Sequence, residues 1–282
     1  MRGYGALVAS AFLALTSPTF GAGFEPPSHG CSQRQPGMRH RAPRPGAYVL
    51  FDVAPRAETF RRGLAVDNLD YPSTKESFDE LVDGLSRAAE RDSASCPKIH
   101  FVGYSLGALL VRAYLQHPHL KSIGRVVMIG PPNHGSEIVD HIGGAWLFRA
   151  VFGAVGAQLG TSAESLPARL GPPDFEFGVI AGNQAINPFG WLWIRGENDG
   201  EVSVESTRLD NMKDFILVPE NHTFMMNGPE VATETVAFLR TGHFLHGDSR
   251  ARRERVGGLA GLWFAPISLG DDPCRQQSHA AD

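Results

Sequence analysis

The sequence predicts an α/β fold with a mostly parallel central sheet and helices on both of its faces. Short apolar runs alternate along the chain with amphipathic segments of helical period, and this alternation is typical of parallel sheets. The 282 residues are 42% hydrophobic, which is enough apolar material for a core. A formal net charge of -4 indicates no nucleic-acid surface, and the three cysteines show neither a CxxC pair nor the spacing of a zinc site.

Six short apolar runs predict the strands of the sheet. They cover residues 48–51, 64–71, 99–102, 125–129, 191–194 and 215–218. Residues 137–190 break the alternation with apolar stretches and many glycines and prolines, and no strand is predicted there.

Three helices are predicted among these strands. Residues 73–76 read Ser-Thr-Lys-Glu, a capping-box pattern, and apolar residues recur at helical spacing over 78–85. A second helix is expected over 106–115, directly behind the third strand. The last is expected over 229–239, with a proline at its first position and Asn227 as its cap.

The two ends of the chain are expected to lie outside the folded domain, which is predicted over residues 47–244. Residues 1–23 resemble a secretory signal peptide, which would make the protein secreted or periplasmic; without a working signal it would be cytoplasmic. Residues 24–46 predict a linker, and 245–282 a disordered tail. No apolar run reaches the roughly 18 residues that a membrane-spanning helix needs.

The most specific motif is a G-x-S-x-G sequence at residues 103–107, with Ser105 at its centre. It follows a predicted strand and opens a predicted helix, which is the setting of a nucleophile elbow. The serine then lies at a helix N-terminus, where free N–H groups and the helix dipole favour a developing anion. Ser105 is therefore the predicted nucleophile, and the structural alternative is a glycine-rich turn between a core strand and its helix.

A serine nucleophile needs a base that a third group orients, and an elbow of this kind predicts the chain order serine, acid, histidine. Asp199 fits the acid, because it lies in the loop after the strand expected at 191–194. Glu197 and Glu201 in the same loop remain alternatives, since reach cannot be read from the sequence. A turn aspartate before glycine is the structural alternative for Asp199.

Among the eleven histidines, His222 is the predicted base, because it lies between the last predicted strand and the last predicted helix. His134 precedes the acid, so its order is wrong for a base, and it is expected to line the site or to cap the next segment. His100 lies inside a predicted strand, where a hydrogen-bonded core role is expected.

Together these motifs resemble the α/β-hydrolase superfamily, specifically its bacterial lipase/esterase-like serine hydrolases. The resemblance covers about residues 47–244 and rests on residues 68–73, 101–107, 124–136, 198–204 and 222–226. It implies Ser105 as nucleophile, Asp199 as orienting acid and His222 as general base. It also implies a helical cap insertion over about 137–190, a small-molecule ester or lipid substrate, and no metal or organic cofactor.

The chain departs from the family pattern at the oxyanion hole. The family carries a His-Gly pair at the end of the first core strand, where this chain has Asp52 and Val53. The backbone N–H groups of Leu106 and Val53 are the predicted donors, whereas a carboxylate at Asp52 opposes the developing negative charge. The predicted function is a serine carboxylesterase or lipase; the alternatives are an impaired relative that binds an acyl or lipid ligand, and an acyltransferase.

Overall fold

A computed structural model of the chain describes residues 48–51, 65–69, 71–93, 98–118, 120 and 123–247. The predicted leader and linker, Asp52, Val53, the three cysteines and the tail beyond Gly247 lie outside the described residues. In the part of the chain that is described, no helix is both long and apolar enough to cross a membrane.

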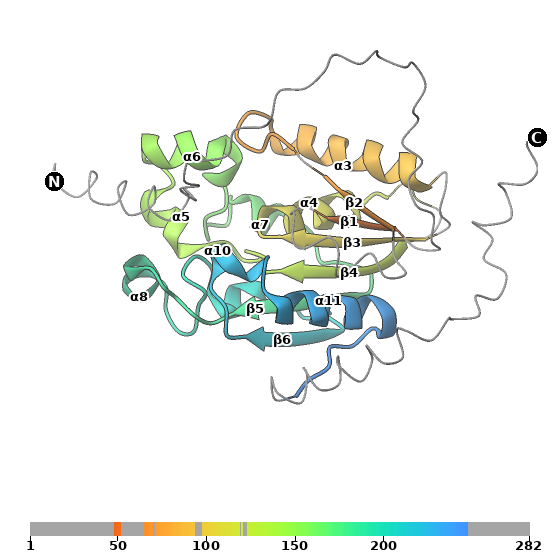
Figure 1. The fold of residues 1–282 in the computed structure, drawn as a ribbon. Coiled ribbons are helices and arrows are strands. Elements are labelled where there is room, and N and C mark those ends of the chain that lie inside the picture. Colours follow the sequence, from red (N-terminus) through yellow and green to blue (C-terminus); the bar gives the residue numbers. More distant parts are fainter. Residues whose placement is uncertain are drawn as a thin grey trace, which may run out of the picture. The chain divides into compact units, whose positions relative to one another are not determined.

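Within the described residues, six parallel strands form one sheet, which confirms the predicted α/β architecture (Figure 1). The strands are β1 (Tyr48–Phe51), β2 (Ala65–Asn68), β3 (Ile99–Tyr104), β4 (Ile123–Ile129), β5 (Phe177–Gly182) and β6 (Asp214–Val218). Their order in the sheet is β2-β1-β3-β4-β5-β6. The chain adds β2 on one side of β1 and the later strands on the other side, so the order of the strands reverses between β1 and β3. Ligand sites in open parallel sheets lie at the carboxyl ends of the strands beside such a reversal, and Ser105 directly follows β3.

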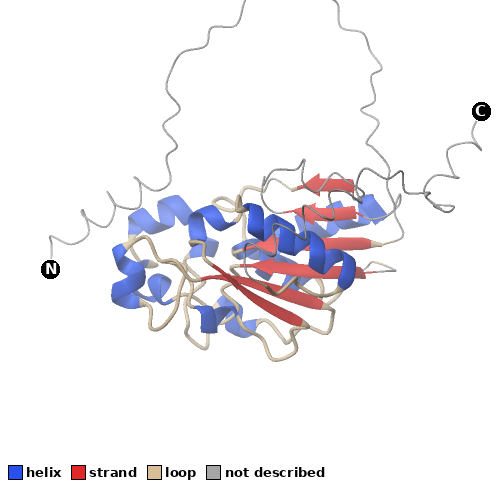
Figure 2. Cartoon of the chain, turned by 60° about the horizontal axis from the view of Figure 1, so that its bottom comes forward, coloured by secondary structure: helices blue, strands red, loops and turns tan. Residues whose placement is uncertain are grey.

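Helices pack on both faces of the sheet and divide the core in two (Figure 2). α3 (Phe78–Ser93) and α4 (Leu106–Tyr114) pack with one face, and α11 (Pro229–Thr241) packs with the other. Successive strand residues alternate between the two sides, as a pleated strand requires: Phe101 belongs to the first core and Val102 to the second. Side chains of β3 therefore pack into both cores, and this packing fixes the end of the strand.

The fifth strand is not where the sequence predicted it. Residues 191–194, expected as a strand, lie mostly in helix α8 (Pro188–Trp193), which Asn187 caps by accepting a hydrogen bond from the Gly190 N–H at 2.7 Å. A four-residue apolar run cannot distinguish a strand from a helix, whereas an asparagine before a proline is a helix-start signal. Trp191 and Leu192 are 70% and 74% exposed, which is incompatible with a central strand.

The strand that takes this place, β5, lies inside the segment that was expected to be a cap over 137–190. Three helices precede it in that segment: α5 (Glu137–Ile142), α6 (Trp146–Gly156) and α7 (Leu166–Arg169). All six residues of β5 are buried, so the strand shows no alternation of polar and apolar positions. The last part of the segment therefore belongs to the sheet.

Both predicted helix caps are wrong, the first by four residues and the second by one. The capping box of α3 is formed by Ser77 and Glu80, whose carboxylate accepts from the Ser77 backbone N–H at 2.8 Å and hydroxyl at 2.7 Å. Residues 73–76 form a turn after Pro72 instead. Likewise, Gly228 rather than Asn227 is the N-cap of α11. Both errors arise because neighbouring residues satisfy the same local pattern.

The folded part continues past residue 244, where the domain was expected to end. Backbone N–H groups of Phe244 and Leu245 donate to Asp214 at 2.8 Å and to Glu234 at 2.7 Å. His246 also contacts Asp214, with 2.6 Å between Nε2 and Oδ1. These contacts attach the chain after α11 to β6 and to α11 itself.

His100 has the core role that the sequence predicted. It lies in β3, is buried, and its Nδ1 accepts a hydrogen bond from the Arg125 backbone N–H at 2.8 Å. Burial, reinforced by the positive charges of Lys98 and Arg125, lowers the pKa of His100 to about 4.

Candidate active site

Ser105 occupies a sharp turn between β3 and α4. It is the N-cap of α4 and has a φ of 50°, which is unusual for a residue with a side chain. Its backbone N–H donates to the Ile129 carbonyl at 2.9 Å and so attaches the turn to β4. A Cβ atom at Gly103 would lie 2.5 Å from the backbone of Ala108, so the helix can pack this closely only against glycine. These features are those expected of a nucleophile elbow.

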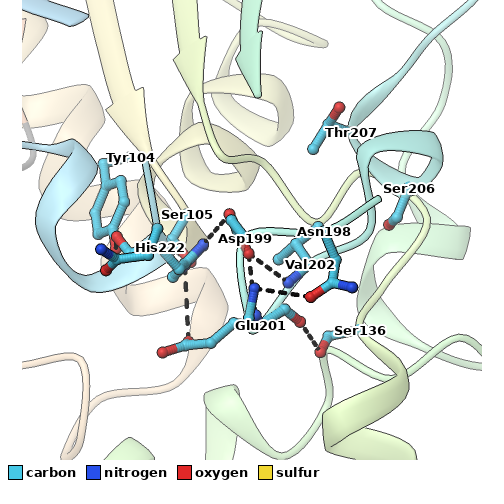
Figure 3. Close-up of polar contacts among 12 residues, drawn as sticks. Tyr104, Ser105, Ser136, Asn198, Asp199, Glu201, Val202, Ser206, Thr207 and His222 are labelled. Atoms are coloured by element: carbon cyan, nitrogen blue, oxygen red, sulfur yellow. Dashed lines mark hydrogen bonds and ion pairs between the residues drawn. The ribbon is translucent and has the colours of Figure 1, made fainter. Parts of the chain in front are cut away.

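His222 approaches Ser105 from the edge of the sheet that β6 forms. It is the first residue of α10 (His222–Met225), a short helix that follows β6. Its Nε2 lies 3.0 Å from Ser105 Oγ, and the residue is only 4% exposed. The Tyr104 hydroxyl donates to the His222 carbonyl at 2.6 Å, which holds the histidine backbone against the turn (Figure 3).

Asp199 completes a continuous chain of polar contacts. Its Oδ2 lies 2.7 Å from His222 Nδ1, and its Oδ1 accepts from the backbone N–H groups of Glu201 at 3.0 Å and Val202 at 2.8 Å. The aspartate is 1% exposed. Both carboxylate oxygens are therefore fixed, one by the imidazole and one by the loop. The structure thus brings together the three residues that the sequence singled out, although a helix and not a strand precedes the acid.

Glycines at the ends of two intervening strands make room for this arrangement. β4 and β5 separate β3 from β6 in the sheet, so the segments carrying His222 and Asp199 must cross their carboxyl ends. A Cβ at Gly130, after β4, would lie 3.2 Å from His222 Cε1 and 2.9 Å from Met225 Sδ. A Cβ at Gly182, the last residue of β5, would lie 2.4 Å from a backbone oxygen and 3.0 Å from Asp199 Cβ. Both positions lie directly beneath the crossing segments.

The other acids and the other histidine that the sequence analysis considered lie elsewhere or face another atom. Glu197 is exposed, and its carboxylate accepts from the Asn183 side chain at 3.3 Å. His134 is exposed, and its backbone N–H donates to the Ser206 carbonyl at 3.1 Å. Glu201 does approach the histidine, but its Oε2 lies 3.8 Å from Nε2, the nitrogen that faces Ser105. Only Asp199 among the three acids contacts Nδ1.

The charges around His222 alter its protonation. Burial alone would lower the pKa of the imidazole, but the negative charges of Asp199 and Glu201 and the hydrogen bond that the imidazole donates to Asp199 outweigh burial and raise that pKa to about 9. Burial raises the pKa of Glu201; the His222 charge opposes this rise and the Asp199 charge adds to it. The imidazolium is thus stabilised from both of its nitrogens.

Two supporting residues were not predicted from the sequence. Tyr104 occupies a free position of the G-x-S-x-G pattern, which places no demand on the residue type there. Ser136 donates from its hydroxyl to the Glu201 carbonyl at 2.5 Å and thereby supports the acid loop. Its segment was part of the family resemblance, but nothing in the sequence connects it to residue 201.

The structure describes one of the two predicted oxyanion donors. Leu106 is the first residue of α4 and directly follows Ser105. Val53 lies outside the described residues. Among the residues that the structure describes, no group of three His, Cys, Asp or Glu side chains could hold a metal ion.

Comparison with solved structures finds similar folds at low sequence identity. A Bacillus licheniformis lipase, BlEst2, in its mature form is 18% identical, with a TM-score of 0.52 over 73% of this chain and 94% of the lipase. The phospholipase PlaB from Legionella pneumophila is 15% identical, with a TM-score of 0.51 over 77% of this chain and 63% of the phospholipase. The sequence matches no protein-family model and no curated protein.

Proposed function

We propose that this chain, which has the α/β-hydrolase fold, is a serine hydrolase that cleaves carboxylic esters through an acyl-enzyme intermediate. One observation carries the proposal: Ser105 Oγ, His222 Nε2, His222 Nδ1 and Asp199 Oδ2 form one chain of contacts of 3.0 Å and 2.7 Å. This is the constellation that activates a serine towards a carbonyl carbon, and it is recognised by geometry.

In the proposed acylation step, one proton moves first from Ser105 to His222 and then from His222 to the leaving alcohol. Ser105 Oγ attacks the ester carbonyl while His222 Nε2 accepts the hydroxyl proton, and Asp199 stabilises the imidazolium that forms. The bond from the carbonyl carbon to the alcohol oxygen then breaks, and Nε2 returns the proton to the leaving alcohol. Water repeats the sequence on the acyl-enzyme and releases the acid. The N–H of Leu106 is one donor available to the oxyanion at the N-terminus of α4.

Exposed apolar side chains at the same end of the sheet as the site support a substrate with a hydrophobic acyl part. Helices α5, α6, α8 and α10 gather at the end of the sheet to which the strands point (Figure 1). In the described part of the chain, the large apolar side chains that are exposed come from this group of helices and the loop before α8: Trp146, Ile186, Trp191, Leu192 and Phe224. Exposed apolar surface of this kind favours contact with an apolar ligand.

A fluorophosphonate probe tests the proposal directly, because it reacts only with a serine that a base has activated. We expect stoichiometric labelling of the purified protein and, after digestion, a single modified peptide that contains Ser105. The probe should fail on protein unfolded in denaturant, since unfolding separates the serine from its base. Absence of labelling on the folded protein would favour the catalytically impaired, ligand-binding alternative. If unlabelled protein that is supplied with an ester transfers the acyl group to an added alcohol faster than to water, it is an acyltransferase.

The raised pKa of His222 predicts an alkaline pH dependence for ester hydrolysis. The imidazole must be neutral to accept the serine proton, and with a pKa of about 9 only about 1% is neutral at pH 7. We therefore expect kcat/KM to rise about 100-fold between pH 7 and its plateau, with an inflection near 9. A pH-stat assay on ethyl butyrate from pH 6 to 10 measures the profile, and an inflection below 7 would contradict the expectation.

A further inference from the structure

The Glu201 carboxylate lies on the reacting side of His222. Its Oε2 is 3.8 Å from Nε2, the same nitrogen that is 3.0 Å from Ser105 Oγ. Asp199, by contrast, contacts Nδ1 on the opposite side of the ring. Figure 3 shows the Glu201 side chain extending from the acid loop past the imidazole, away from Asp199. The catalytic sequence proposed above assigns no role to this carboxylate.

The backbone of Glu201 is fixed, while the end of its side chain reaches the site. Its N–H donates to Asp199 Oδ1 at 3.0 Å, and its carbonyl accepts from the Ser136 hydroxyl at 2.5 Å. The side chain is 30% exposed. Among the described residues, no lysine or arginine lies within 4 Å of its carboxylate, and His222 is the one cationic partner that it has. A carboxylate held in this way is available to a cation on a bound substrate.

The alcohol part of an ester must lie beside this carboxylate. In acylation, Nε2 protonates the leaving oxygen, so that oxygen is within hydrogen-bond reach of Nε2. Since Glu201 approaches the same nitrogen, a substituent two carbon atoms from the leaving oxygen lies within reach of Oε2. With a neutral alcohol, the carboxylate opposes the negative charge that develops on the carbonyl oxygen. A positive charge on the alcohol offsets that opposition and pairs with the carboxylate.

We propose that Glu201 is a specificity-determining residue that selects esters whose alcohol carries a positive charge, such as a quaternary ammonium or a protonated amine. This inference rests on the proposed ester hydrolysis and adds a substrate class to it. The acyl part contacts the apolar surface, and the cationic alcohol contacts Glu201.

The test compares two thioesters of the same shape that differ in one charge. Butyrylthiocholine carries a quaternary nitrogen, and S-(3,3-dimethylbutyl) thiobutyrate has carbon in its place; both release a thiol that one assay detects. We expect kcat/KM for the cationic substrate to exceed that for its neutral isostere on the order of tenfold. Glu201→Gln should reduce this ratio towards one, and Glu201→Asp, which keeps the charge on a shorter side chain, should give an intermediate ratio.

Glu197→Gln is the matched control, because it removes one charge from the same loop at a carboxylate that does not contact His222. Its ratio should equal that of the unmodified protein. A ratio near one in the unmodified protein, or an unchanged ratio in Glu201→Gln, would overturn the inference. Hydrolysis of p-nitrophenyl butyrate, measured alongside, separates the two proposals. If this ester is hydrolysed and the ratio of the two kcat/KM values is near one, only the specificity inference fails. If this ester is not hydrolysed, the proposed function fails and the inference fails with it.

Discussion

Replacing Ser105 with alanine is expected to reduce kcat/KM for p-nitrophenyl butyrate by about 10⁴- to 10⁶-fold. In the proposed mechanism the hydroxyl oxygen bonds to the substrate, and it lies 3.0 Å from His222 Nε2, the nitrogen proposed to accept its proton. What remains after its loss is transition-state binding by backbone donors, which supports only slow attack by water. The measurement is the initial rate of p-nitrophenol release at pH 8, with the spontaneous rate subtracted.

Ser86→Ala is a suitable control, since the Ser86 hydroxyl contacts Glu90 on the same surface helix. This variant should retain the full rate. Equal rates in the unmodified protein, Ser105→Ala and Ser86→Ala would show that the rate does not come from this site. Near-ultraviolet circular dichroism on each variant checks that the comparison is made between folded proteins.

Replacing Asp199 with asparagine is expected to lower kcat/KM by about 10⁴-fold, although the change is nearly isosteric. Oδ1 accepts two backbone N–H groups, from Glu201 and Val202, so the amide oxygen of asparagine must occupy that position. The amide NH₂ group then faces His222 Nδ1 and forces this nitrogen to accept a hydrogen bond. The ring proton moves to Nε2, which can no longer accept the proton of Ser105.

The same assay with Glu197→Gln and Glu201→Gln shows which carboxylate of the loop orients the imidazole. Glu197→Gln should have little effect, because Glu197 is exposed and contacts Asn183. A loss in Glu201→Gln as large as that in Asp199→Asn would mean that the orienting role is shared. Substantial activity in Asp199→Asn would contradict the assignment of Asp199.

The sequence allowed the elbow to be predicted accurately, because three independent signals coincide there. The strand composition before Gly103, the glycine-flanked serine and the helical period after Leu106 all indicate the same local structure. The sequence of β5 offers no such set of signals that indicate the same structure. The strand is buried on both faces and contains Gly178 and Gly182, so it shows neither alternation nor a run of strand-forming residues. The helix-start signal of Asn187 and Pro188 was present, but the apolar run behind it was interpreted as a strand.

The site was predictable as a set of residue types and a chain order, whereas its internal geometry was not. Glu197, Asp199 and Glu201 lie within five consecutive residues, and the course of one loop decides which of them contacts Nδ1. That course depends on Ser136 and on the His222 N–H, which donates to the Asp199 carbonyl at 2.9 Å. Contacts between distant segments of this kind leave no local pattern in the sequence. The position of Glu201 beside Nε2 was hidden for the same reason.

The crossing of β4 and β5 by the segments that carry Asp199 and His222 determines when the proposed activity arises during folding. Ser105 and His222 are 117 residues apart in the chain, and their contact spans strands that are three places apart in the sheet. A chain that has paired only β1 to β4 has a nucleophile turn without a base. Because contacts between distant residues require costly loop closure, they form late in folding. Recovery of catalysis after dilution from denaturant therefore reports the completed sheet, whereas recovery of helical signal reports an earlier, inactive stage.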